Sequence, residues 1–407
     1  MKVLMVNNLY APNIRGGAER SVQLLAEALV RSGNAVTVVS TDERERERTE
    51  INGVSVLALP PANLHWAFGA TAPSAVQRKL WHLVDVYNPI MRRRLAAVLR
   101  AEQPDVVHTN NLQGISTAAW AMAAAEGVPV LHTLRDYYLA CARSTAFRDG
   151  RNCAGLCLEC MPFAMARRSA SRAVAGVAGT SRFILDYHLE LGFFARASFR
   201  AAICNPTTAA PPRSNRGDTL TFGYLGRLEP SKGVAALLRA FADRADARWQ
   251  LLIAGTGTKA TVEELQRQAA GARRSAQIQF VGWADSAEFL GRVDVLIVPS
   301  LWHEPLARAA IEAQSQGVPV IVSRRGGLPE IVDEGNSGLV FEPDDPESLP
   351  AAIDRLLKDE DLVLRLSRGA LEQARCYRPE AVAAQYGEAY GAVIASKPSD
   401  PPVVPPW

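Results

Sequence analysis

Short β-branched strands alternate with helical segments in two rounds along this 407-residue chain, and this alternation constrains the fold more than any other feature. The first round predicts strands at 3–6, 35–40, 54–59, 105–108 and 128–132, with helices at 18–31 and 117–126. The second round predicts strands at 220–225, 250–254, 278–281, 293–298 and 318–322. Strands that are almost wholly apolar and joined by helices are typical of parallel sheets covered on both faces. The sequence therefore predicts an α/β protein with two domains of comparable size.

A proline-rich break sets the expected domain boundaries. Residues 206–218 (PTTAAPPRSNRGD) contain almost no apolar side chains and predict a linker between a first domain at 1–205 and a second at 219–377. A helix at 378–395 is expected to pack back across the junction. The proline-rich residues 396–407 predict a disordered tail.

Composition limits the classes of protein. The chain is 48% hydrophobic and 21% charged, which is typical of a globular protein. No apolar run approaches the roughly 18 residues needed to cross a bilayer. The apolar residues 3–6 are also too few for a signal peptide. We therefore expect a cytoplasmic protein.

The first half of the chain is basic. Residues 1–200 carry 23 Lys and Arg against 16 Asp and Glu, whereas the net charge of the whole chain is +3. This asymmetry favours an anionic partner, such as a phosphate or an acidic lipid surface, although ordinary solvated faces would give the same count. Nucleic acid is not an expected partner, because Arg92-Arg93-Arg94 is the only tight basic cluster and no base-reading motif occurs.

Two further stretches of the first domain are rich in charged residues. Residues 42–50 (DERERERTE) alternate in sign between two predicted strands, which predicts a solvated surface loop. Residues 77–100 predict one helix that carries Trp81, Met91 and a basic face. This helix either packs on the core with its basic face in water or attaches to a membrane, and both interpretations stay open.

Glycine-rich loops follow the first strand of each predicted domain. Gly16 and Gly17 open a helix, where backbone can approach a ligand and free N–H groups can meet an anion, although a plain turn is the alternative. In the second domain Gly226 begins the turn GRLEPSKG, which places Arg227 and Lys232 five residues apart. Arg227 can make a forked contact with phosphoryl oxygens and Lys232 adds a point charge, so this turn predicts a diphosphate site.

Two carboxylates mark the most specific site. Glu304 lies in the loop after a predicted strand, and Glu312 lies eight residues later in a helix that begins near Leu306. Carboxylates in these positions can bind separate hydroxyl-bearing parts of one ligand, while backbone N–H groups at Leu306 and Ala307 meet an anion. A surface capping pair is the alternative.

Taken in order, these motifs resemble those of retaining glycosyltransferases of the GT-B fold, of the large family-4 or group 1 type. The matching segments are GGAE, GRLEPSKG, AGTG, FVGW, VDVLIVPS, Glu304-x7-Glu312, AQSQGVPVIVS, GGLPEIV and GNSGLVF. The resemblance covers residues 1–395 and is strongest over 220–345. It implies two Rossmann-like α/β domains that face each other across a cleft.

Carried over position by position, the resemblance implies that the second domain binds a nucleotide-diphosphate sugar. Glu312 would accept hydrogen bonds from the ribose hydroxyls, and Glu304 and the backbone after it would lie against the donor sugar. Arg227 and Lys232 would neutralise the diphosphate, and the paired glycines of the first domain would close on it. Because fixed cations can stabilise a dianionic leaving group beside an oxocarbenium-like sugar, no cofactor is expected for the chemistry. The one formal DxD motif, at 359–361, is read as surface charge.

One position departs from the family pattern. The family often has a His near the end of the strand at 128–133, where Arg135 stands in this sequence. A guanidinium can clamp a phosphate but cannot act as a general base. Alternatively, His132 or Asp136 takes the role through a shifted register, whereas His108 is expected to pack at a strand end.

Four of the six cysteines cluster in an insertion at about 137–162: Cys141, Cys153, Cys157 and Cys160. In a cytoplasmic chain this spacing favours a structural zinc site, with an iron–sulfur cluster, free thiols and redox use as alternatives. Because the insertion directly follows Asp136, we expect it to border the cleft and to shape the acceptor site.

These features predict a hexosyltransferase that moves a sugar from a UDP- or GDP-linked donor to a glycan or lipid-linked acceptor. We expect it to act in cell-surface polysaccharide or glycolipid biosynthesis, with peripheral contact to the inner face of the cell membrane. Three alternatives stay open. A nucleotide-sugar epimerase of the same fold would convert donor without acceptor, a non-catalytic nucleotide-sugar-binding protein would turn nothing over, and a metal-dependent nucleic-acid binder would use the cysteine cluster.

Overall fold

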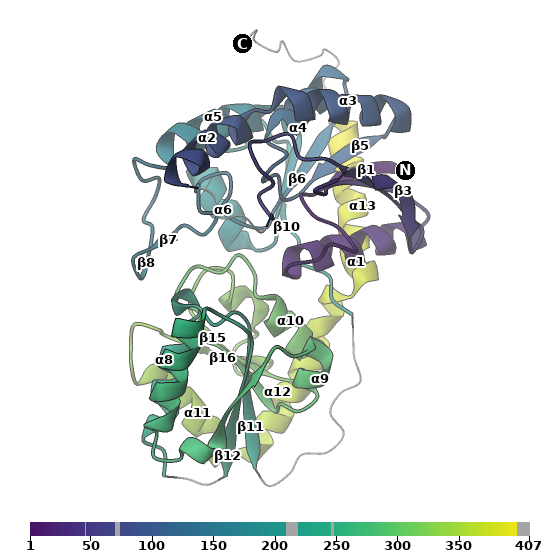
Figure 1. Ribbon diagram of the computed structural model, residues 1–407. Coiled ribbons are helices and arrows are strands. Elements are labelled where there is room, and N and C mark those ends of the chain that lie inside the picture. Colours follow the sequence, from purple (N-terminus) through teal and green to yellow (C-terminus); the bar gives the residue numbers. More distant parts are fainter. Residues whose placement is uncertain (45, 70–73, 209–218, 246–247, 397–407) are drawn as a thin grey trace. The chain divides into compact units, whose positions relative to one another are not determined.

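The computed structural model describes residues 1–44, 46–69, 74–208, 219–245 and 248–396 and divides into two compact units (Figure 1). Unit 1 consists of Met1–Ala146, Cys153–Pro206 and Pro379–Trp407, and unit 2 of Phe147–Asn152 and Thr207–Arg378. The predicted linker and the predicted tail lie almost wholly outside the described residues. Within the described ranges, no helix combines the length and the apolar character needed to cross a membrane.

The described part of unit 1 is built on an eight-stranded sheet with the order β10-β9-β6-β5-β1-β2-β4-β3. Its strands are β1 (Lys2–Val6), β2 (Ala35–Thr41), β3 (Arg46–Ile51), β4 (Val54–Leu59), β5 (Val106–Thr109), β6 (Val130–Leu134), β9 (Gly176–Gly179) and β10 (Phe199–Ala202). Neighbouring strands run parallel except for β3 and β4. Side chains of the central strands are buried on both faces, as a sheet covered by helices requires.

Helices connect these strands and cover the sheet. They are α1 (Gly17–Arg31), α2 (Ala75–Val86), α3 (Pro89–Glu102), α4 (Ala118–Ala125), α5 (Met161–Ala170), η1 (Ser171–Ala173), α6 (Arg182–Glu190) and α13 (Pro379–Ala395). A short hairpin of β7 (Phe147–Arg148) and β8 (Arg151–Asn152) interrupts unit 1 in sequence and belongs to unit 2.

Two predictions for unit 1 were wrong. The single helix expected at 77–100 is two helices, because Pro89 starts α3 and cannot continue the hydrogen-bond ladder of α2. The Asn88 side chain caps the second helix by accepting from the N–H groups of Ile90 and Met91 at 3.1 and 3.0 Å. The loop expected at 42–50 contains strand β3, whose backbone pairs with β4 at the sheet edge while its charged side chains stay exposed.

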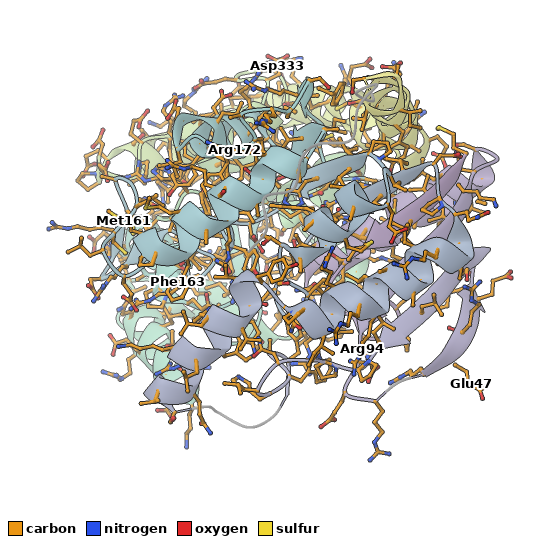
Figure 2. The ribbon with its side chains drawn as sticks, turned by 90° about the horizontal axis from the view of Figure 1, so that it is seen from above. Glu47, Arg94, Met161, Phe163, Arg172 and Asp333 are labelled. Carbon is orange, nitrogen blue, oxygen red and sulfur yellow. The ribbon has the colours of Figure 1, made fainter. Side chains whose placement is uncertain are left out.

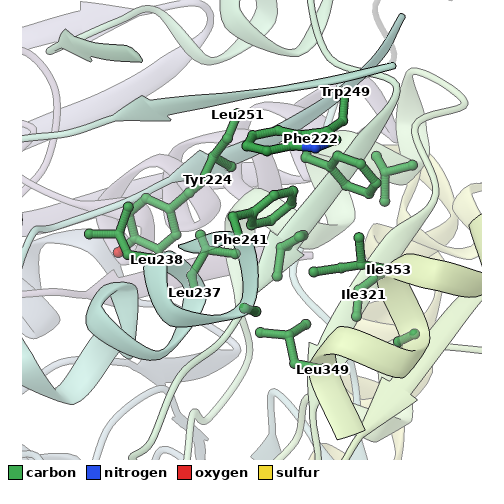
Figure 3. Close-up of a cluster of buried hydrophobic side chains, with 14 of the residues drawn as sticks. Phe222, Tyr224, Leu237, Leu238, Phe241, Trp249, Leu251, Ile321, Leu349 and Ile353 are labelled. Carbon is green, nitrogen blue, oxygen red and sulfur yellow. The ribbon is translucent and has the colours of Figure 1, made fainter. Parts of the chain in front are cut away.

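Unit 2 holds a six-stranded parallel sheet with the order β13-β12-β11-β14-β15-β16 in its described residues. The strands are β11 (Leu220–Leu225), β12 (Trp249–Ala254), β13 (Ile278–Gly282), β14 (Val295–Val298), β15 (Val320–Ser323) and β16 (Gly338–Phe341). The helices are η2 (Pro230–Lys232), α7 (Val234–Ala242), α8 (Lys259–Ala270), η3 (Ser275–Gln277), α9 (Ser286–Leu290), α10 (Arg308–Ser315), η4 (Pro329–Ile331), α11 (Ser348–Lys358), α12 (Glu360–Gln373) and η5 (Ala374–Tyr377). Figure 3 shows the core on one face of this sheet, where Phe222, Phe241 and Trp249 pack together.

Helix α13 follows unit 2 in sequence but packs within unit 1, against α1, β6 and β10. Two of its side chains reach buried polar groups of the sheet. The Tyr390 hydroxyl lies 2.8 Å from Nδ1 of His108, and the Tyr386 hydroxyl lies 3.0 Å from Oγ1 of Thr133. Because these groups are buried, their hydrogen bonds help fix α13 on the sheet.

Candidate functional site

The sheet of unit 2 changes direction between β11 and β14. From β11 the chain runs outward through β12 to β13, then returns to β14 and continues outward through β15 to β16. In open parallel sheets, ligands bind beyond the carboxyl ends of the strands at such a switch point. The loop after β11 carries Arg227 and Lys232, and the loop after β14 carries Glu304. The topology therefore brings the predicted residues of two separate motifs to one edge.

Glycines let the loops at this edge touch each other. Gly233 has a φ of 73°, and a Cβ at this position would overlap the carbonyl oxygen of Pro299 at the end of β14. Gly326 has a φ of 58°, and its Cβ would overlap the backbone of Glu304. Both positions thus need glycine for the left-handed backbone and for the close approach. The loops after β11, β14 and β15 form one interlocked cluster.

Lys232 and Glu304 form the centre of this cluster. The Lys232 Nζ lies 2.5 Å from Oε1 of Glu304, although the residues are 72 positions apart, and the Ser300 hydroxyl donates to the same oxygen at 2.7 Å. Both charged side chains are largely buried. Burial acts to raise the pKa of Glu304, but Lys232, Ser300 and Trp302 together hold it below its usual range. Glu304 is therefore a carboxylate in this site.

The predicted diphosphate arginine lies at the start of the same loop. Arg227 Nη1 is 2.8 Å from Oε1 of Glu229, and both side chains are exposed. The Tyr224 hydroxyl donates to the backbone oxygen of Arg227 at 2.7 Å, which fixes the backbone of the turn. Gly226 donates its N–H to the carbonyl of Ala254 at 3.1 Å, so the turn begins in register with β12.

Glu312 lies on α10 and already has two partners. Its Oε1 pairs with Arg308 Nε at 2.6 Å, one helical turn away, and its Oε2 accepts from the Ser286 hydroxyl of α9 at 2.5 Å. Leu306 is half-buried in the loop before α10, and Ala307 is the N-cap residue of this helix. Glu304 therefore lies in the loop before α10 and Glu312 lies within α10, as the sequence predicted.

Sequence reasoning missed several residues that shape the loop after β14. Lys232 Nζ lies 4.9 Å from the ring centre of Trp302, a cation–π contact. Asn152, at the end of β8, donates to the carbonyl of Leu301 at 2.9 Å and accepts from the N–H of His303 at 2.8 Å. Trp302 stands two residues before Glu304 in the sequence, so it could have been predicted as part of this loop. Asn152 gave none, because its contacts span about 150 residues.

The predicted glycines of unit 1 lie after β1, at the start of α1. Gly16 is the exposed N-cap residue of the helix, and its N–H donates to Oε2 of Glu19 at 2.8 Å. Gly17 is the first residue of α1. The expected helix start is therefore present, with the carboxylate of Glu19 at the position where a ligand anion was expected.

The three candidates for the cleft histidine of the family have different surroundings. Arg135 is buried, donates from Nε to Oδ1 of Asn110 at 2.8 Å and also bonds to Asn205. Burial lowers the pKa of His132 to about 3, and its ring stacks on Phe194. Burial also raises the pKa of Asp136 to about 6. His132 is therefore a neutral core residue, and Asp136 is the only one of the three that titrates close to neutral pH.

His108 packs inside the sheet as expected. Its ring nitrogens face the Tyr390 and Thr133 hydroxyls at 2.8 Å each, and burial lowers its pKa well below the usual value. A histidine with both nitrogens occupied by neutral partners serves packing rather than proton transfer.

The four clustered cysteines lie in one neighbourhood. Burial raises the pKa of Tyr187 to about 12, and each of Cys141, Cys153, Cys160 and Cys157 adds to this shift electrostatically. The Cys157 and Cys160 side chains hydrogen-bond to each other. Among the described residues, no group of three or more His, Cys, Asp or Glu side chains converges as a metal site. The zinc site therefore stays a prediction from the cysteine spacing.

The formal DxD motif at 359–361 has a structural use. Asp359 is the N-cap residue of α12, where its Oδ1 accepts from the N–H of Leu362 at 2.9 Å. Arg365 also pairs with Asp359, at 3.1 Å. This aspartate therefore caps a helix, as its N-terminal position favours.

Two family models match the chain. The model described as "Glycosyl transferases group 1" matches residues 208–373, and the "Glycosyl transferase 4-like domain" matches residues 16–205. The two matches meet close to the boundary between units 1 and 2.

The chain is also similar to named relatives and solved structures. It is 32% identical over 342 residues to an uncharacterized 42.6 kDa protein in the cps region of Klebsiella pneumoniae, covering 81% of this chain and 87% of the relative. Sucrose-phosphate synthase from Thermosynechococcus elongatus superimposes with a TM-score of 0.73 at 22% identity, covering 97% and 99% of the two chains. Anabaena HepE in complex with UDP superimposes with a TM-score of 0.70 at 17% identity, covering 96% and 100%.

Proposed function

Because the chain belongs to the group 1 glycosyl transferases and has their GT-B type of fold, we propose that it is a retaining, hexosyl-transferring enzyme that uses a UDP- or GDP-linked sugar. The observation that carries this proposal is the Lys232–Glu304 pair at the switch point of unit 2, with Arg227 on the same loop. Support for the donor class comes from HepE, which is solved with UDP and with UDP-glucose.

Arg227 and Lys232 bind the diphosphate of the donor in this proposal. The Arg227 side chain is exposed and is held by a surface carboxylate, so it can turn toward phosphoryl oxygens at little energetic cost. Lys232 has three N–H donors, of which Glu304 takes one, and the others can reach a phosphate. Their positive charges stabilise the diphosphate as its bond to the sugar breaks, and no metal ion is needed for that step.

Glu304 and Glu312 bind hydroxyl groups of the donor. Glu304 is a buried carboxylate whose position is fixed by Lys232 and Ser300, so it can accept hydrogen bonds from the sugar without reorganising. Glu312 is held by Arg308 and Ser286 and accepts from the ribose hydroxyls. Backbone N–H groups at Leu306 and Ala307 contribute further contacts at the start of α10.

Unit 1 contributes the acceptor side. Of its candidate residues, Arg135 is the cation nearest the end of β6, and the glycines at the start of α1 allow close approach to a phosphate. We propose a glycan or lipid-linked acceptor at the inner face of the cell membrane. The relative from a cps region supports a role in polysaccharide biosynthesis, and the basic first half of the chain supports an anionic surface as partner.

A structural zinc ion at the four clustered cysteines remains part of the proposal, and it rests on the spacing of these cysteines in the sequence alone.

The test is a thermal shift assay with UDP, GDP, ADP, TDP and CDP. We expect a selective rise in Tm for UDP or GDP, because a ligand that binds only the folded state stabilises it by mass action. Glu312→Ala is expected to abolish the rise. Glu263→Ala is the matched control, because Glu263 also pairs with a cation one helical turn away, Lys259 on α8 at 3.8 Å.

The outcomes separate the alternatives. A rise that survives Glu312→Ala, or no rise with any nucleotide, would overturn the assigned donor site. Sugar conversion without an acceptor would indicate an epimerase, and binding with no turnover in the presence of lysate glycans and lipids would indicate a nucleotide-sugar-binding protein. Retention is tested by the anomeric configuration of the product relative to the donor.

A further inference from the structure

Helix α2 carries apolar side chains toward solvent as well as toward the core. Trp81 faces the core, where its indole N–H donates to the carbonyl of His65 at 2.9 Å. Val76, Leu80 and Leu83 are 67%, 48% and 60% exposed and lie at positions i, i+4 and i+7, so they form one stripe on the outer side. A helix that only covers a core needs one apolar stripe, and a second stripe indicates a second apolar environment.

Helix α5 continues this pattern. Met161 and Met165 lie four residues apart on α5 and are exposed, and Leu158, in the turn before the helix, is 87% exposed. Two exposed arginines follow, Arg168 in the last turn of α5 and Arg172 in η1 directly after it. Figure 2 labels Met161, the first residue of α5, and Arg172, in η1 beyond the end of α5. The exposed side of α5 is therefore apolar at its start, at Met161 and Met165, and basic at its end, at Arg168.

Helices α2 and α5 pack against each other and share a buried polar network. Arg167 of α5 donates to the carbonyl of Tyr138 at 2.6 Å and lies 3.5 Å from the carboxylate of Asp85 of α2. The Tyr138 hydroxyl donates to the same carboxylate at 2.6 Å. All three side chains are buried, so this network fixes the positions of α2 and α5, and of their exposed apolar side chains, relative to each other.

The charges around the stripes are almost all positive. Residues 51–102 contain six Lys and Arg but two acidic residues, Asp85, which is buried in the network, and Glu102, which pairs with Arg48. Arg78, Lys79 and Arg93 are exposed on α2 and α3. Beside the stripe of α5, Glu159 lies 3.8 Å from Arg143. An anionic surface would therefore meet cations with little opposing charge.

We propose that the α2–α5 face is a docking surface for an anionic lipid bilayer. This face consists of Val76, Leu80, Leu83, Leu158, Met161 and Met165, together with the basic side chains beside them. Apolar side chains on one side of a helix, flanked by Lys and Arg, insert at the boundary between headgroups and acyl chains. A second copy would instead bring its own excess of positive charge against this face, and such like-charge contacts are unfavourable.

This inference deepens the membrane location in the proposed function and does not depend on the donor chemistry. A transferase that acts on a lipid-linked acceptor meets that acceptor in the bilayer. A face on the unit that contributes the acceptor side would keep the enzyme at the surface where such an acceptor resides.

The test is flotation of the full-length protein with vesicles. We expect the protein to float with phosphatidylglycerol–phosphatidylcholine vesicles at about 0.1 M salt and to be released at about 1 M salt, where charge screening is stronger. Pure phosphatidylcholine vesicles are expected to leave it in solution. Leu80→Ser/Leu83→Ser and Arg78→Glu/Lys79→Glu are each expected to lower the bound fraction about tenfold or more.

The control is Leu364→Ser/Leu371→Ser, which changes two exposed leucines of α12 in unit 2, 45% and 40% exposed. It is expected to float like the unchanged protein. The nucleotide-induced rise in Tm, measured on every variant, shows that the fold and the donor site are intact. In the unchanged protein, a rise without flotation would overturn the docking surface and leave the proposed donor site in place.

Three results would overturn the proposal. The first is a protein that stays in solution with anionic vesicles. The second is flotation that is unaffected by both double variants of the α2–α5 face. The third is a dimer in solution that Leu80→Ser/Leu83→Ser converts to a monomer without any flotation, which would assign the face to a second copy of the chain.

Discussion

Each charged side chain of the candidate donor site already has a partner of opposite charge. Arg227 pairs with Glu229, and Lys232 pairs with Glu304. The two pairs differ in burial, because the first is exposed and the second is largely buried. An exposed pair contributes little to stability and can open for a ligand. Removing one partner of a buried pair is strongly destabilising, because it leaves the other charge buried without a partner.

A double-mutant cycle tests this difference. Lys232→Met leaves the Glu304 carboxylate buried without its cation, so we expect it to lower the free energy of unfolding by about 3 kcal/mol. Lys232→Met/Glu304→Gln should recover most of this loss while transferring no sugar. Urea unfolding measures both variants and the single change Glu304→Gln, which completes the cycle. A double variant that is as unstable as the sum of its single changes would contradict the pairing.

At the scale of elements, motif spacing predicted where the candidate residues lie better than it predicted their contacts. Arg227, Lys232, Glu304 and Glu312 were predicted because each follows a strand whose sequence clearly indicates burial. The pairing of Lys232 with Glu304 could not be predicted, since it depends on β14 lying beside β11 in the sheet. Such an order follows from packing across the whole unit rather than from local sequence.

The errors in the predicted elements have local causes. Strand β3 was missed because its alternating charges suit an exposed loop equally well, and only its pairing with β4 distinguishes the two. The break between α2 and α3 could have been predicted, because Asn88 before Pro89 is a typical helix start. The role of Asn152 could not, because the short hairpin that carries it gives no local signal for its distant partners.

A pair of glycine substitutions tests how closely the loops at the site interlock. Gly233→Ala and Gly335→Ala both place a side chain at positive φ, 73° and 81°, which is unfavourable by about 1–2 kcal/mol. At Gly233 the added Cβ also overlaps the carbonyl oxygen of Pro299, whereas nothing lies within 4 Å of it at Gly335. We therefore expect Gly233→Ala to be clearly less stable and to lose the nucleotide-induced rise in Tm.

Gly335→Ala serves as the control for backbone strain alone. It should keep the response to nucleotide and lose only the stability that the positive φ accounts for. Equal stability and equal nucleotide binding in the two variants, compared by thermal unfolding, would rule out the interlock as a determinant of the site.

At the scale of the whole molecule, buried histidines make stability depend on pH. Burial lowers the pKa of His188 to about 4 and that of His132 to about 3. In the unfolded chain these groups bind protons near their usual pKa of about 6.5. Between these values the unfolded state binds more protons than the folded state, so stability should fall as the pH drops below about 6.5.

His188→Phe isolates one of these groups. We expect the loss of stability on lowering the pH from about 6.5 to 5 to be smaller in this variant, by up to about 1.4 kcal/mol per pH unit. Urea unfolding at a series of pH values gives the slope. Phe193→Leu, at a ring that contacts His188, should lower stability by the same amount at every pH. Parallel pH profiles for His188→Phe and the unchanged protein would refute this assignment.

The return of α13 to unit 1 has a consequence for synthesis on the ribosome. Unit 2 is an insertion within unit 1, because the residues that complete the core of unit 1 come after Arg378. The buried hydroxyls of Tyr386 and Tyr390 reach His108 and Thr133 only after nearly the whole chain has emerged. Unit 2 can therefore finish folding during translation, while the first-made unit keeps an open apolar groove until the last helix arrives. Unit 1 is thus the first unit to start being synthesised and the last to finish folding.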